Sequence, residues 1–178
     1  MQINTLQEAL LLELQDLYNA EQQLVQGLPR MASAASNRDL KVAFEQHLSE
    51  TKNQVARLEK VFSLMGERPR GETCEAMEGL IEEAEEVINA SGDREVKDAV
   101  LIGAAQRVEH YEIAGYGTAR AFAKQLGLDD VVDLLDETLD EESAADKKLT
   151  TLAEGGIFSA GINKQARTKK GGEFEQRI

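Results

Sequence analysis

The sequence predicts an all-α protein: a four-helix bundle with one short extra helix in the long crossover between helices 2 and 3. Ala, Leu, Glu and Gln are abundant and only two Pro occur, a composition that favours helix. Four long stretches carry apolar residues at helical spacing, and each apolar stripe must be buried against another element. No strand-like alternation of useful length is present. A helical bundle is therefore the expected way to bury the four stripes.

The acidic composition restricts the partners that the protein can bind. The chain has 178 residues and a net charge of −13, which disfavours binding to nucleic acid and to anionic membranes. Its one cysteine, Cys74, excludes an internal disulfide and metal sites built from several thiolates. The N-terminal stretch does not resemble a signal peptide, and no run approaches the ~20 apolar residues of a membrane span. We expect a cytoplasmic protein, and no motif indicates a specific small-molecule substrate.

The helices are expected between clear capping and breaking signals. Asn4 or Thr5 can cap the first helix, and Glu8 lies where a capping box needs it. This helix extends towards residue 36, although Pro29 can kink it or end it early. The next helices should end at glycines, which are the usual residues beyond a helix C-terminus. They are expected at residues 40–65, 74–90, 94–126 and 129–154.

The chain divides into a helical bundle and a tail. The bundle is expected to occupy residues 1–155, since the last apolar stripe ends just before a Gly-Gly pair. Residues 156–178 are polar, contain Gly and are locally basic (NKQARTKKGG). Such a composition is typical of a loosely held, solvated end, so we expect a polar C-terminal tail.

A carboxylate interrupts the apolar stripe of two predicted helices, and an internal repeat relates the two. Glu21 and Glu112 differ by 91 in residue number, as do Glu50 and Glu141, and leucines around both pairs match at the same offset. Two antiparallel hairpins related by a pseudo-twofold axis would bring all four carboxylates together in the middle of the bundle. Four such groups cannot all stay ionised at close range without a compensating cation. Oxygen ligands suit iron, manganese, magnesium or calcium.

Two further residues can add ligands to this site. Glu109 precedes Glu112 by three residues, so both can face one ion. His47 precedes Glu50 by one turn and is the nearest source of a nitrogen ligand. The alternative is a bundle whose carboxylates point outward or pair with Arg and Lys. The predicted metal ligands are Glu21, Glu50, Glu112, Glu141, Glu109 and His47, with Glu142 or Asp146 as the second choice for the fourth helix.

Three segments of the long helices carry a family resemblance: FEQHLSETKNQVARLE, RVEHYEIAGYGTARAFAKQLG and LLDETLDEESAADKKLTTLA. The chain resembles the YciE/YciF stress-response family of bacterial ferritin-like proteins over about residues 4–155. This resemblance implies a ferritin-like bundle that forms a homodimer. It implies no defined reaction, because the family is known mainly from its association with stress responses.

The histidines depart from the ferritin-like pattern, which places His three residues after the Glu of the second and fourth helices. Here Asn53 follows Glu50 and Ala144 follows Glu141 at that spacing. We expect a ferritin-like stress-response protein with a dinuclear carboxylate site for iron or manganese, other divalent cations remaining open. The alternative is a non-enzymatic, dimeric helical stress protein with a degenerate or vacant site. Whether the protein is an enzyme is left open.

Overall fold

The described part of the chain is almost entirely helical, which confirms the all-α prediction. The computed structural model describes residues 3–156 and 159–168. A pair of two-residue antiparallel strands, β1 and β2, follows the last long helix. In chain order the elements are α1 (Leu6–Ala34), α2 (Arg38–Leu64), α3 (Glu75–Asn89), α4 (Arg94–Gln125), α5 (Asp129–Glu154), β1 (Gly155–Gly156), β2 (Ser159–Ala160) and α6 (Ile162–Thr168).

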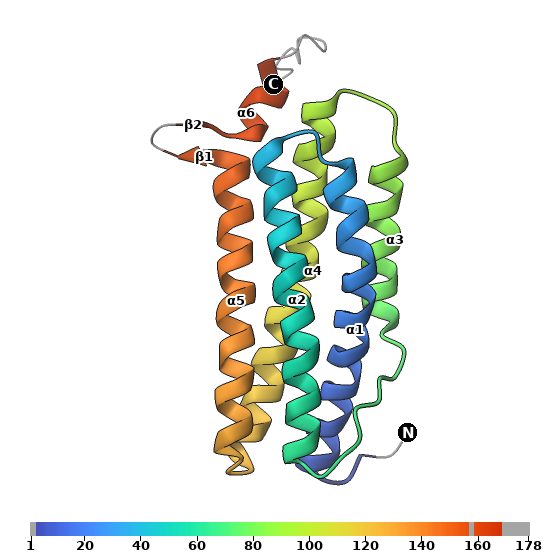
Figure 1. Ribbon diagram of the computed structural model, residues 1–178, viewed down its shortest axis with the longest axis vertical. Coiled ribbons are helices and arrows are strands. Elements are labelled where there is room, and N and C mark those ends of the chain that lie inside the picture. Colours follow the sequence, from blue (N-terminus) through green and yellow to red (C-terminus); the bar gives the residue numbers. More distant parts are fainter. Residues whose placement is uncertain (1–2, 157–158, 169–178) are drawn as a thin grey trace, which may run out of the picture.

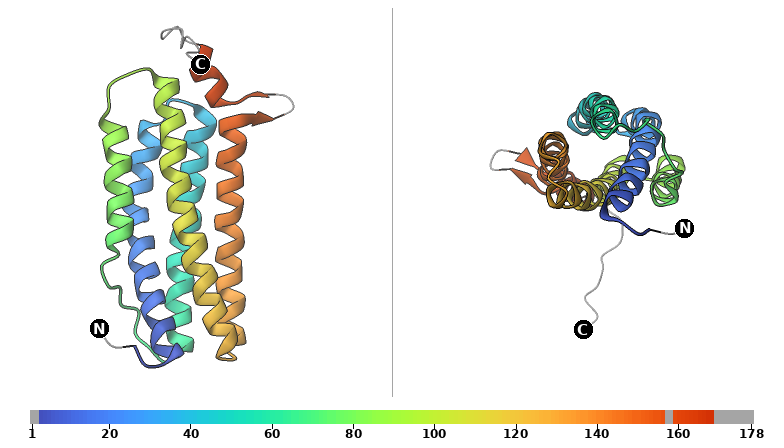
Figure 2. Two further views of the ribbon diagram at one scale, coloured as in Figure 1. Left: turned by 180° about the vertical axis from the view of Figure 1, so that it is seen from behind. Right: turned by 90° about the horizontal axis from the view of Figure 1, so that it is seen from below.

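The four long helices α1, α2, α4 and α5 run side by side along the longest axis of the molecule (Figure 1). Each packs against two others in a ring, α1 with α2 and α4, and α5 with α2 and α4. Helix α3 packs outside this ring against α1 and α4, as the end view also shows (Figure 2). The connection through α3 returns the chain to the opposite end, so α2 and α4 run in the same direction. Among the described residues, no helix has the length and apolar character needed to cross a membrane.

The helix ends follow the signals in the sequence. Thr5 and Glu8 form the predicted capping box at the start of α1. The Asn37 side chain accepts hydrogen bonds from two backbone N–H groups at the start of α2. Gly66 and Gly127 follow α2 and α4 with positive φ, a conformation that glycine adopts without strain. Pro29 lies inside α1, which continues to Ala34, close to the predicted end near residue 36.

The core has two apolar clusters with a polar layer between them. On α1, one cluster extends to Tyr18 and the other begins at Ala20. On α4, one cluster ends at Val108 and the other begins at Tyr116. The intervening turns of the four long helices carry buried polar side chains instead. These side chains, which we call the polar layer, are Glu21, His47, Thr51, Gln54, Glu109, Glu112, Thr138 and Glu142.

Two contacts fix the relative positions of the helices that surround this layer. Asp98 on α4 is buried and accepts hydrogen bonds from the backbone N–H groups of Ser36 and Asn37, which holds the α1–α2 turn. Gly115 on α4 faces Leu17 on α1. A Cβ atom there would lie 2.8 Å from Leu17 Cδ2, so a larger residue would force the Leu17 side chain to move.

Part of the segment expected as a tail is helical. Ile162 at the start of α6 is buried in the apolar cluster nearest the α1–α2 turn, and α6 packs against α4 and α5. The expected division of the chain at residue 155 remains a prediction. Residues 157–158 and 169–178, which belong to that expected tail, lie outside the described residues.

Candidate metal centre

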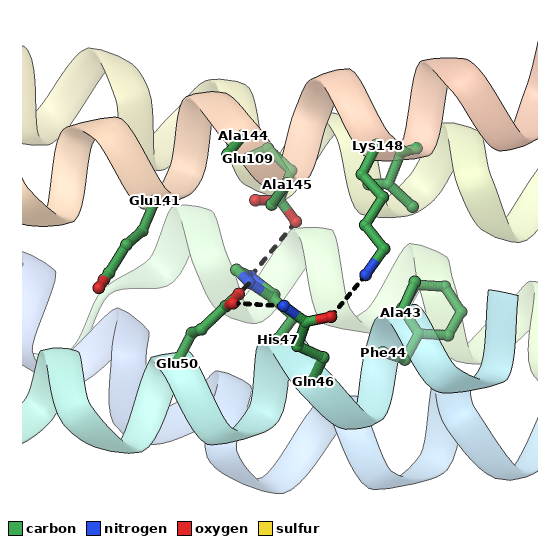
Figure 3. Close-up of a pocket in the computed structure, with 11 residues that line it drawn as sticks. Ala43, Phe44, Gln46, His47, Glu50, Glu109, Glu141, Ala144, Ala145 and Lys148 are labelled. Atoms are coloured by element: carbon green, nitrogen blue, oxygen red, sulfur yellow. Dashed lines mark hydrogen bonds and ion pairs between the residues drawn. The ribbon is translucent and has the colours of Figure 1, made fainter. Parts of the chain in front are cut away.

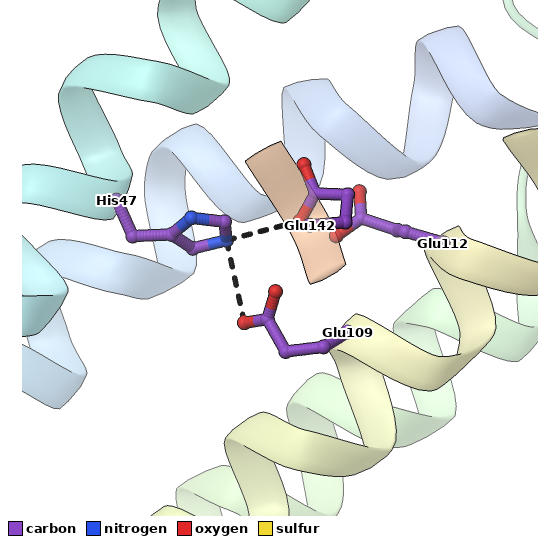
Figure 4. A group of neighbouring side chains, drawn as sticks. All are labelled: His47, Glu109, Glu112 and Glu142. Atoms are coloured by element: carbon purple, nitrogen blue, oxygen red, sulfur yellow. Dashed lines mark ion pairs between the residues drawn. The ribbon is translucent and has the colours of Figure 1, made fainter. Parts of the chain in front are cut away.

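Four side chains of the polar layer converge from three helices. His47 on α2 places its Nε2 atom 3.3 Å from a carboxylate oxygen of Glu109 on α4 (Figure 3). The same nitrogen lies 3.7 Å from an oxygen of Glu142 on α5. With Glu112 they form a group in which each residue offers one ligand atom, and these atoms all lie within 4.8 Å of one another (Figure 4). Carboxylate oxygens and an imidazole nitrogen at such spacing can bind one shared cation.

Helix geometry explains how the group forms. Glu109 and Glu112 are three residues apart on α4, so both point to the same side of that helix. His47 occupies the matching level on α2, and Glu142 does so on α5, because both residues fall between the apolar clusters. Glu109 is 2% exposed, and neither Glu112 nor Glu142 has any exposed surface. Carboxylates removed from water in this way are costly unless charges or ligands compensate them.

Several polar atoms of this layer have no hydrogen-bond partner within the described protein. Buried donors and acceptors are nearly always satisfied in folded proteins, so a cluster of exceptions needs an explanation. A cation would accept lone pairs from all the oxygens at once, and the donor set therefore fits a metal ion. The atoms without a hydrogen-bond partner are Glu21 Oε2, His47 Nδ1 and Nε2, Gln54 Oε1, Glu109 Oε2, Glu112 Oε1 and Oε2, and Glu142 Oε2. The His47 nitrogens nevertheless lie 3.3 to 3.7 Å from carboxylate oxygens.

The electrostatics of the layer oppose full ionisation of the carboxylates. Burial, followed by the nearby charge of Glu142, raises the pKa of Glu21 to about 8. Burial also raises the pKa of Glu112 well above its usual value, and the neighbouring carboxylates add to this shift. The pKa values of Glu109 and Glu142 are raised as well, again chiefly by burial. For His47, burial lowers the pKa, but the charge of Glu109 and other carboxylates outweigh it and raise the pKa to about 10.

Glu21 lies beside the four-residue group. It is fully buried on α1, and the Tyr116 hydroxyl donates a hydrogen bond to its Oε1 atom. Tyr116 lies one turn after Glu112 on α4, so this bond brings Glu21 close to the level of Glu112, and the charge of Glu21 contributes to the raised pKa of Glu112. The structure thus brings the two stripe glutamates of the repeat, Glu21 and Glu112, into one buried layer.

Glu50 and Glu141, the second predicted pair, lie at the rim of the layer. Glu50 is half-buried, accepts a hydrogen bond from the Gln46 side chain, and has one oxygen 3.5 Å from His47 Nδ1. Glu141 binds Arg57, whose guanidinium nitrogens lie 2.9 and 3.0 Å from its two oxygens. The alternative of pairing with arginine therefore describes Glu141, while Glu50 remains next to the histidine.

Glu142 takes the interior position on α5, and the other second choice, Asp146, does not. Successive residues of a helix differ by about 100° in direction, so Glu142 and Glu141 cannot both face the centre. Glu142 lies seven residues from both Leu135 and Leu149, which are buried. This seven-residue spacing is the feature of the sequence that could have identified Glu142 as the inward-facing carboxylate of α5. Asp146 instead accepts a hydrogen bond from Gln106 at the edge of the α4–α5 interface.

Comparison with known proteins places this chain in a family. Residues 5–166 match the family described as "Domain of unknown function (DUF892)". Protein YciF of Escherichia coli K12 is 46% identical over 170 residues, which are 95% of this chain and 99% of that protein.

Two solved structures are similar to the whole fold. The crystal structure of the E. coli stress protein YciF superposes with a TM-score of 0.84 at 43% identity, covering 94% of this chain and 100% of that chain. YcfI from Rhodopseudomonas palustris superposes with a TM-score of 0.83 at 47% identity, covering 85% of this chain and 97% of that chain. These findings confirm the resemblance to the YciE/YciF family. The chain is a homologue of the stress protein YciF and belongs to the DUF892 family.

Proposed function

We propose that the protein is a ferritin-like stress-response protein that binds iron or manganese at a dinuclear carboxylate centre in the polar layer. The observation that carries this proposal is the set of buried carboxylate and imidazole atoms without hydrogen-bond partners. Leaving such atoms unsatisfied costs free energy in a protein interior, and a divalent cation offsets both the missing bonds and the like-charge repulsion.

The proposed ligands come from all four long helices. His47, Glu109, Glu112 and Glu142 supply the converging group, and Glu21 supplies a further buried oxygen beside it. In this proposal Glu50 and Glu141 of the predicted set stay at the rim. A donor set of many oxygens and one nitrogen suits iron or manganese, and a redox-active ion would supply electron-transfer chemistry with oxygen or peroxide.

Neighbouring residues hold these ligands in place. The Tyr116 hydroxyl donates to Glu21, and the Gln54 side-chain amide donates to Glu142. Each bond satisfies one oxygen of its carboxylate and leaves the other oxygen free to bind an ion. Such supporting hydrogen bonds fix the orientation of metal ligands and are usually needed for full affinity.

The proposal includes the ferritin-like arrangement, the homodimer, the cytoplasmic location and a bundle that ends at residue 155. The ring of four long helices and the α3 crossover support the arrangement. The homodimer rests on the family resemblance, and sedimentation analysis of the purified protein checks it.

Metal loading of purified protein tests the central part of the proposal. We expect the wild-type chain to retain about two iron or manganese ions after anaerobic loading and desalting. A variant with Glu109→Gln, Glu112→Gln and Glu142→Gln should retain almost none, because its buried oxygens no longer carry charge.

A variant with the same loss of charge on the exposed face of α3 is the matched control. Glu82→Gln, Glu83→Gln and Glu86→Gln change residues that are exposed and far from the polar layer in sequence. This control should bind as much metal as the wild type. Equal metal content in all three proteins would refute the proposal. The interpretation that remains is a non-enzymatic helical stress protein with a degenerate or vacant site.

A further inference from the structure

A small pocket opens between α2 and α5 and reaches the polar layer at its inner end (Figure 3). Its volume is about 160 Å³. Gln46, Ala144 and Lys148 are exposed and form its outer part. His47 and Glu109 are buried and form part of its inner wall. A molecule in this pocket would therefore lie directly against two members of the candidate metal centre.

The internal repeat helps to explain the open space on this side of the α2–α5 contact. At the offset of 91, Ala145 corresponds to Gln54 and Lys148 corresponds to Arg57. Gln54 and Arg57 fill their side of the contact, because both donate hydrogen bonds to Glu141 across it. On the other side, Ala145 has no side chain long enough to fill the same space. The Lys148 amine is exposed and donates to Gln46 at the mouth of the pocket.

The lining of the pocket defines the chemistry of its occupant. Phe44, Leu149 and three alanines give most of the wall an apolar surface. At the inner end, Glu109 has an oxygen without a hydrogen-bond partner. The His47 nitrogens have carboxylate oxygens at 3.3 to 3.7 Å but make no hydrogen bond. The charged groups of the lining have both signs: His47 lies 3.3 Å from Glu109 and 3.5 Å from Glu50, and Lys148 lies at the mouth. The wall therefore favours neither an anion nor a cation. An apolar cavity of about 150 Å³ is large enough to hold benzene.

We infer that this pocket binds a neutral molecule of phenol size, with an apolar body and one hydroxyl group. The body packs between Phe44 and Leu149, and the hydroxyl bonds to Glu109 or His47. This inference goes beyond the proposed metal function and does not depend on it. The pocket is formed by the protein alone. A metal ion would bind the same Glu109 and His47 atoms as the hydroxyl, so the metal-free protein is expected to bind the molecule more tightly.

Phenol titration of the full-length protein tests the inference, with methyl NMR signals of alanine as the readout. Saturable binding in the millimolar range is expected for a ligand of about seven heavy atoms. The largest shifts should fall on Ala43, Ala144 and Ala145 of the chelator-treated protein. Benzene, which lacks the hydroxyl, and benzoate, which is an anion, should each bind at least about tenfold more weakly than phenol.

An Ala145→Leu variant fills the pocket and should weaken phenol binding by at least about tenfold. Ala56→Leu adds the same side chain at an exposed position of α2 outside the pocket and should bind like the wild type. Circular dichroism checks that both variants fold. If Ala145→Leu does not fold, the inference is tested by the wild-type protein alone, from whether the largest phenol-induced shifts fall on the three alanines of the pocket.

Three results would overturn the inference: no saturable phenol binding, shifts centred away from the three alanines, or unchanged binding in folded Ala145→Leu. Benzoate binding as tight as that of phenol would overturn the predicted ligand class. The metal proposal fails separately, through loss of metal retention. Phenol binding to a protein that retains no metal would therefore support the pocket and refute only the metal centre.

Discussion

The Glu142→Gln variant is expected to bind manganese(II) at least about 100-fold more weakly than the wild-type protein. Glu142 has no exposed surface and belongs to the group whose ligand atoms lie within 4.8 Å of one another. Replacing its charged oxygen with an amide removes both a ligand and the charge that attracts the cation. Competition against a metal-binding dye measures the affinity in both proteins.

Glu141→Gln is the matched control, because it makes the same chemical change one residue away. Glu141 binds Arg57 and is partly exposed, so this variant should keep its manganese affinity to within about threefold. It should instead lose some stability, since Arg57 loses a charged partner. The opposite ranking, a large loss for Glu141→Gln and a small one for Glu142→Gln, would show that the rim glutamate is the ligand.

Metal-free protein is expected to lose stability as the pH rises from about 5 to 8. The pKa of Glu21 is raised from 4.5 to about 8 in the folded state, first by burial. Its contribution to stability is therefore fully present below pH 4.5 and is lost as the pH rises through 8. His47 acts in the same direction at higher pH, because its pKa rises from 6.5 to about 10. Each pKa unit is worth about 1.4 kcal/mol, so Glu21 alone accounts for a loss on the order of 4 kcal/mol.

Thermal unfolding of chelator-treated protein measures this effect. A loss of that size lowers the Tm by roughly 10 °C in a chain of this length. Glu21→Gln should flatten the profile, because the amide does not titrate. Added manganese should restore stability most strongly near pH 8, where the ligands are deprotonated. A Tm that stays constant or rises between pH 5 and 8 would contradict the described environment of Glu21.

Much of the fold follows from local signals that a single sequence displays. The capping box of Thr5 and Glu8, the Asn37 cap and the glycines after α2 and α4 depend on neighbouring residues alone. The effect of Pro29 could not be decided from the sequence, and the helix continues past it to Ala34, close to the predicted end. Helix α6 was not predicted, because its polar sequence gives little periodic signal and its buried residue Ile162 packs on residues distant in the sequence.

The candidate site could be predicted only in part. Glu21 and Glu112 stand out because each interrupts an apolar stripe, and Glu109 and His47 follow from helical spacing. The choice between Glu141 and Glu142 depends on the rotation of α5 about its axis. The repeat matches Glu141 to Glu50, but it does not show that both members of that pair lie at the rim. Only the packed structure shows which carboxylate faces inward.

The pocket beside the site illustrates the same limit. Ala145 is an unremarkable residue in the sequence, and its importance comes from the absence of a side chain where its repeat partner Gln54 has one. The hydrogen bonds that Gln54 and Arg57 donate to Glu141 cross between α2 and α5, so they depend on distances that spacing alone does not define.

Anomalous X-ray diffraction from crystals of manganese-loaded protein tests the central claim most directly. Data collected on both sides of the manganese absorption edge locate the ion without reference to the protein model. We expect a peak within about 2.5 Å of oxygens from Glu109, Glu112 and Glu142 and near a nitrogen of His47. A loaded crystal whose anomalous peaks lie only at surface carboxylates, with none in the polar layer, would contradict the account.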